Sequence, residues 1–77
     1  MRRITTSAEE IRYDIVSQCI EWREAHGLTR TMVAKAGGLA YHDIFMFETR
    51  RRFYWSAIVA YCNLGCVIKM QRKVTQR

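Results

Sequence analysis

The residues best suited to contact a polyanion lie in one stretch, 28–52, which reads LTRTMVAKAGGLAYHDIFMFETRRR. The pattern predicts two short helices joined by a glycine turn and followed almost at once by Arg50, Arg51 and Arg52. In a small basic chain, such a unit is expected to place its second helix in the major groove of DNA. The outward positions of that helix are unusual, because they are largely aromatic, apolar or acidic where DNA-reading helices usually carry amides, hydroxyls and arginines.

Composition agrees with a polyanionic partner. The chain has 77 residues, of which 49% are hydrophobic types, and this suits one folded domain over 1–77. Its 13 Lys and Arg residues against 7 Asp and Glu residues give a net charge of +6. The excess predicts nucleic acid as the partner ahead of an anionic membrane surface. The basic residues gather around the 28–52 stretch instead of along an amphipathic helix, which disfavours membrane binding.

Several other classes are disfavoured by residue spacing. Cys19, Cys62 and Cys66 are an odd set among apolar neighbours, which predicts buried thiols in a reducing cytosol rather than disulfides or a metal site. Neither histidine has a catalytic spacing to a serine or cysteine, so we expect no enzymatic activity and no cofactor. The apolar run 58–66 is too short to span a bilayer, and no signal-peptide pattern is present. A cytoplasmic, nucleoid-associated protein is therefore expected.

The flanking elements are predicted to be helical. A capping box at Ser7 and Glu10 opens a helix over 8–26 that Gly27 ends. Its inward stripe is expected to comprise Ile11, Ile15, Cys19 and Trp22. A helix over about 54–63 should bury Tyr54, Ala57, Ile58, Tyr61 and Leu64, and Gly65 should stop it.

The predicted helix-turn-helix spans about 29–49. Thr29 caps its first helix, and Gly38 can take the positive φ that the turn needs. Its second helix, about 41–49, has Asp43 in the first turn, where a carboxylate favours the helix dipole. The side chains expected to point inward are Met32, Val33, Ala36, Leu39, Ile44 and Phe47.

After Gly65 the apolar period changes to two, which predicts a strand over about 66–71. An isolated strand is unstable in water, so we expect it to pair with the same strand of a second copy and close a two-fold dimer. The expected dimer contacts are Cys66, Val67, Ile68, Lys69 and Met70, and a basic tail follows over 72–77.

Between residues 19 and 65 the chain carries a series of marker residues in a fixed order: Arg23, Gly27-Leu28-Thr29, Ala34, Gly38, Ile44, Glu48 and Leu64-Gly65. The series resembles the Cro/repressor (XRE) helix-turn-helix family, and the terminal strand resembles that family's antitoxin-like branch. The resemblance implies an all-α domain of about four to five helices with a short strand pairing across a dimer. It also implies an ion pair between Arg23 and Glu48, and a close approach of the two helices of the motif at Ala34.

The resemblance further implies which residues meet DNA. Base-reading positions are Tyr41, His42, Phe45, Met46 and Thr49, whose groups can form hydrogen bonds or contact thymine methyls. Phosphate contacts are expected from Thr29, Arg30, Arg50, Arg51 and Arg52. The implied function is a homodimeric, sequence-specific transcriptional repressor on a palindromic operator. The alternative is a protein-interaction module that binds a toxin or a polymerase through the apolar face of the second motif helix.

Overall fold

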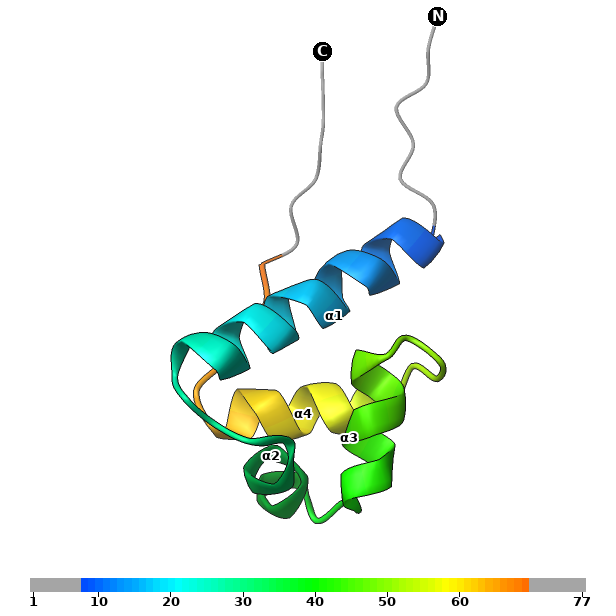
Figure 1. Ribbon diagram of the computed structural model, residues 1–77. Coiled ribbons are helices and arrows are strands. Elements are labelled where there is room, and N and C mark those ends of the chain that lie inside the picture. The colour runs from blue at the N-terminus through cyan, green and yellow to red at the C-terminus, as the bar shows by residue number, and fades with distance from the viewer. Residues whose placement is uncertain (1–7, 70–77) are drawn as a thin grey trace, which may run out of the picture.

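The computed structural model describes residues 8–69, which form four helices and no strand (Figure 1). The helices are α1 (Ala8–Ala25), α2 (Arg30–Gly37), α3 (Tyr41–Glu48) and α4 (Trp55–Asn63). The all-α class predicted from the sequence is confirmed, and each boundary lies within a residue or two of its expected place. None of the helices in 8–69 combines the length and the apolar character that crossing a membrane would require.

The core forms where α4 lies between α1 on one side and α2 on the other, with α3 at one end (Figure 1). Phe47 and Tyr61 are fully buried at its centre, with ring centroids 5.8 Å apart. The remaining buried apolar residues are Ile15, Val16, Cys19, Val33, Ala34, Ile44, Ala57, Ile58, Ala60 and Cys66. Most of the predicted inward positions are therefore confirmed.

Three predicted core positions are wrong. Met32 is 48% exposed, because the short helix α2 turns only the arc at Val33 and Ala34 toward the body. Leu64 is 37% exposed, because the chain turns after α4 and Cys66 takes the buried place instead. Ile11 is 37% exposed, and the buried side of α1 begins only at Ile15.

The connection between α2 and α3 depends on both glycines of the pair. Thr29 caps α2 by accepting the Met32 N–H at its hydroxyl oxygen (3.2 Å), as predicted. Gly38 ends α2 with φ 67°, a left-handed conformation that favours glycine. Gly37 has a different role, because a Cβ added there would lie 2.5 Å from the Ala60 Cβ. The missing side chain at Gly37 lets α2 pack closely on α4.

Residues 66–69 leave α4 as an irregular segment that returns to α1. The Cys66 N–H donates to the Tyr61 carbonyl (3.1 Å), which holds the turn. The Gln18 side chain then bonds both backbone groups of Lys69, accepting its N–H (2.7 Å) and donating to its carbonyl (2.6 Å). The predicted strand is not formed within 66–69, because a side-chain amide of the same chain already satisfies the backbone at Lys69. The capping serine Ser7, Met70 and the tail 72–77 lie outside the described residues.

Candidate nucleic-acid interface

The orientation of α3 is fixed by one buried carboxylate. Glu48 ends α3 and is only 4% exposed. It accepts two hydrogen bonds from Arg23 of α1 (Nε 2.8 Å, Nη2 3.0 Å) and one from Arg30 of α2 (Nε 2.9 Å). The Tyr61 hydroxyl of α4 donates to the same carboxylate. The Arg23–Glu48 ion pair implied by the resemblance is present, and it belongs to a larger cluster that joins all four helices.

The charge state of this cluster follows from its contacts. Burial alone would raise the pKa of Glu48, but hydrogen bonds from Arg23, Tyr61 and Arg30 outweigh it and hold the pKa below its ordinary value. The same contacts raise the pKa of both Arg23 and Arg30, chiefly through their hydrogen bonds to the carboxylate. Burial, followed by the hydrogen bond to Glu48, raises the pKa of the Tyr61 hydroxyl. The cluster is therefore ionised on its Glu and Arg members at neutral pH, while Tyr61 keeps its proton.

The outward side of α3 carries a small aromatic group organised by Arg30. Tyr41 is 49% exposed, and its ring stacks near Phe45 with centroids 6.3 Å apart. The Arg30 guanidinium lies 5.4 Å from the Phe45 ring centroid and donates to the Tyr41 hydroxyl (3.2 Å). Arg30, one of the predicted phosphate contacts, is shared between Glu48 and this aromatic pair. His42 is exposed beside them.

The other predicted base-reading residues differ in their availability. Phe45 and Met46 are half-buried, so the α3 surface is less apolar than the sequence suggested. The Thr49 hydroxyl donates to the Phe45 carbonyl (2.8 Å) at the end of α3, which occupies its only proton. Asp43 accepts the Ala40 N–H (3.3 Å) and so serves the start of the helix, as predicted. Tyr41 and His42 are the best-exposed polar groups on this side of α3.

The three arginines after α3 do not share one direction. Arg50 has φ 62°, which is uncommon for a residue other than glycine, and its side chain folds back onto α1. Its guanidinium donates to the Ser17 hydroxyl (2.7 Å) and lies 3.9 Å from the Tyr13 ring centroid. Arg51 and Arg52 donate their backbone N–H groups to the Met46 carbonyl (3.0 and 3.3 Å), and both residues are exposed.

A cleft of about 300 Å³ opens between the first half of α1 and the connection after α3. Glu9, Arg12 and Tyr13 of α1 line one side and residues 50–53 the other. The Arg12 guanidinium lies 5.5 Å from the Phe53 ring centroid, across the cleft. No sequence pattern predicts this site, because Arg12 and Phe53 come together only through the packing of distant segments.

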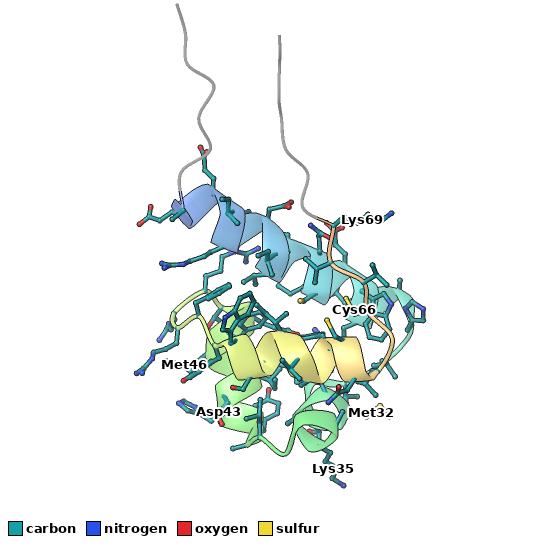
Figure 2. The ribbon with its side chains drawn as sticks, turned by 180° about the vertical axis from the view of Figure 1, so that it is seen from behind. Met32, Lys35, Asp43, Met46, Cys66 and Lys69 are labelled. Atoms are coloured by element: carbon teal, nitrogen blue, oxygen red, sulfur yellow. The ribbon has the colours of Figure 1, made fainter. Side chains whose placement is uncertain are left out.

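The residues expected to form the dimer contact differ in how far their side chains are exposed. Val67 is 71% exposed, whereas Cys66 is buried in the core, where its thiol meets that of Cys19. Burial raises the pKa of both the Cys19 and Cys66 thiols. Ile68 is partly buried, and Lys69 is exposed over α1 (Figure 2). Only Val67 and Lys69 thus offer well-exposed side chains to a partner within 66–69.

Searches among protein-family models, curated proteins and solved structures gave no match to this chain. Within 8–69, no group of three or more His, Cys, Asp or Glu side chains is placed to hold a metal ion.

Proposed function

We propose that this chain is a sequence-specific DNA-binding repressor with a Cro/repressor-like helix-turn-helix. The observation that carries the proposal is the α2–Gly38–α3 unit, whose second helix is locked at Glu48 by the other three helices while Tyr41 and His42 stay exposed. A reading helix must present its side chains from a fixed frame, because base edges are recognised through hydrogen-bond geometry. The net charge of +6 suits a phosphate backbone.

In this proposal, affinity and selectivity come from different residues. The free N–H groups at the start of α2, beside the capping Thr29, favour a phosphate oxygen. Arg51 and Arg52 add exposed positive charge after α3. Tyr41 and His42 supply the polar contacts to base edges. Arg30 acts mainly by holding the Tyr41 hydroxyl and supporting Glu48.

The proposed active form is a homodimer on a palindromic operator in the cytoplasm, at the nucleoid. Two α3 helices related by a two-fold axis would enter successive major grooves about 34–36 Å apart. Residues 66–71 remain the proposed dimer segment, with the exposed Val67 as its apolar contact. The Gln18 side chain already bonds the N–H and the carbonyl of Lys69. A strand from a second copy would therefore have to pair along the other side of this segment, or displace the Gln18 amide.

A protein-interaction module is the second candidate, and one observation favours it. Trp55 is 69% exposed and Val59 is 53% exposed, one turn apart on the outer side of α4. The α3 surface, by contrast, shows Tyr41 with Phe45 and Met46 half-buried. A partner protein, such as a toxin or a polymerase subunit, would therefore find more apolar surface on α4 than on α3.

Selection of bound sites from random duplex DNA, followed by footprinting at two salt concentrations, tests the leading proposal. We expect one palindrome to be enriched, with affinity falling steeply as salt rises, because phosphate contacts release counterions. Salt-insensitive capture of a protein without affinity for any duplex would contradict it.

Variants separate the two roles. Arg51→Ala should weaken binding to all sites alike, whereas His42→Ala should change site preference, at a cost of about 1–3 kcal/mol on the preferred site. Lys35→Gln is a suitable charge control, because Lys35 points away from the body at the end of α2 (Figure 2). Equal weakening of all sites by Arg51→Ala and His42→Ala would argue against base reading by α3.

A further inference from the structure

The cleft between α1 and the α3–α4 connection concentrates positive charge. Its walls carry four arginines (Arg12, Arg50, Arg51 and Arg52) and one carboxylate, Glu9. In the described part of the chain, the ion pairs join only Arg23 and Arg30 to carboxylates, and neither lines this cleft. Positively charged residues around one opening repel one another, so an anion bound there would relieve that repulsion.

Aromatic rings hold several of these guanidinium groups in place. Arg50 lies 3.9 Å from the Tyr13 ring centroid and Arg12 lies 5.5 Å from the Phe53 ring centroid. Such contacts fix a cation without neutralising its charge. The remaining N–H donors of Arg12 and Arg50 therefore stay available at the walls of the cleft.

Backbone conformation at Arg50 also contributes to this arrangement. With φ 62°, Arg50 occupies a region that costs a bulky residue free energy, and such residues cluster at binding sites. The turn sends the Arg50 side chain back to Ser17 on α1, while the Arg51 and Arg52 N–H groups bond the Met46 carbonyl. The left-handed Arg50 thus ends α3 and directs its own side chain to the α1 wall of the cleft, while the other two arginines line the cleft from the connection.

The chemistry of the walls indicates the class of ligand. Guanidinium groups bind phosphoryl oxygens through paired N–H donors, because the planar fork matches the geometry of the anion. A volume of about 300 Å³ lies at the small end of the range for ligand pockets. We infer that this cleft is a phosphoryl-binding site for a small free ligand of about nucleoside-monophosphate size, held by Arg12 and the arginines of 50–52.

A DNA backbone phosphate carries the same chemistry, but the position of the cleft favours the free ligand. One wall of the cleft is α1, whereas the exposed Tyr41 lies at the opposite end of α3, about 11 Å away along the helix. Arg50 points toward Ser17 of α1 and not toward Tyr41. Binding of a small ligand in this cleft can be tested without DNA, so the inference does not depend on the proposed DNA binding.

Titration of the ¹⁵N-labelled chain with AMP, inorganic pyrophosphate and uncharged adenosine tests the site. We expect AMP and pyrophosphate to shift the amide signals of residues 9–16 and 50–53, and adenosine to leave them unchanged. Arg12→Gln should weaken AMP binding about threefold, and Glu9→Gln should strengthen it about twofold, because each alters one exposed charge at the wall. Glu21→Gln is the matched control, since it removes an exposed α1 carboxylate remote from the cleft and should leave the affinity unchanged.

Each alternative outcome contradicts the inference. Absence of saturable shifts with both AMP and pyrophosphate would overturn it, and so would shifts confined to α2 and the start of α3. An equal gain of affinity in Glu9→Gln and Glu21→Gln would indicate attraction to net charge without a site. If only duplex DNA responds to Arg12→Gln, the cleft belongs to a DNA contact and the free-ligand assignment is wrong.

Discussion

The arginines around α3 fall into two groups whose surroundings differ. Arg23 and Arg30 share the buried carboxylate of Glu48, which offsets one of their two positive charges inside the scaffold. Arg12 and the arginines of 50–52 meet aromatic rings, a hydroxyl and solvent, and their charge remains at the surface. Residue type alone therefore does not decide whether an arginine stabilises the fold or contacts an anion. What distinguishes the two groups is whether a buried carboxylate lies beside the arginine.

Substitution of the shared carboxylate should produce the largest effect. Glu48→Gln leaves the 12% exposed Arg23 side chain without its counter-charge, and we expect a loss of about 3–5 kcal/mol in the free energy of unfolding. Urea unfolding followed by circular dichroism measures it. Glu24→Gln is the matched control, because Glu24 is 66% exposed and lies 3.9 Å from the same arginine. We expect the control to change stability by less than about 0.5 kcal/mol, and equal effects of the two variants would remove the distinction between the groups.

The next largest effect is expected on lowering the pH, which should remove the stability that Glu48 contributes through the arginines of the scaffold. The pKa of Glu48 is lower in the folded chain than in the unfolded chain, so its contribution is complete above its ordinary pKa of about 4.3 and is lost as pH falls through the folded pKa. Urea unfolding between pH 7 and pH 2 should show this loss in the wild type. The difference in the free energy of unfolding between the wild type and Glu48→Gln should shrink over the same range. A difference that does not depend on pH would contradict the assignment of this stability to the ionised carboxylate.

A smaller effect is expected at Arg50. The contact between Arg50 and Tyr13 is a cation–π pair on a ring that is 59% exposed, so we expect a coupling free energy of about 0.5–1 kcal/mol. A double-mutant cycle with Arg50→Gln and Tyr13→Leu measures it. A coupling indistinguishable from zero would mean that the ring does not hold the guanidinium in place.

Arg51 should show the smallest effect on stability. Arg51→Gln removes one exposed charge, and we expect the free energy of unfolding to change by less than about 0.5 kcal/mol while the affinity for DNA falls. Arg23→Gln makes the same chemical change in the other group and should destabilise the fold strongly. A large loss of stability in Arg51→Gln would place this arginine in the scaffold.

Local chemistry was sufficient to predict the helices from the sequence. The Thr29 cap and the left-handed Gly38 are determined by neighbouring residues, so spacing alone identifies them. The prediction for Met32 is wrong because the buried side of a helix of about two turns is too narrow to locate from periodicity. The segment 66–69 has the alternation of a strand, yet the Gln18 amide from 51 residues away satisfies its backbone.

The candidate sites were predictable only in part. Exposure of His42 follows from the helical period, which places it opposite Ile44 and Phe47. Tyr41 lies one turn before Ile44, so the period alone does not predict its exposure. The second arginine on Glu48 and the cleft could not be predicted, because both depend on how α1 and α2 meet the end of α3. No spacing rule relates Arg12 to Phe53, which are joined only in three dimensions.

The close approach of Gly37 and Ala60 has a consequence for how this sequence can change over evolution. The two positions share a space that admits one methyl group, since a second would lie 2.5 Å from the first. Alanine at 37 would ordinarily favour a helix, yet here it becomes acceptable only if residue 60 loses its own methyl. Positions 37 and 60 should therefore covary in descendants of this chain, with the methyl group exchanged between α2 and α4.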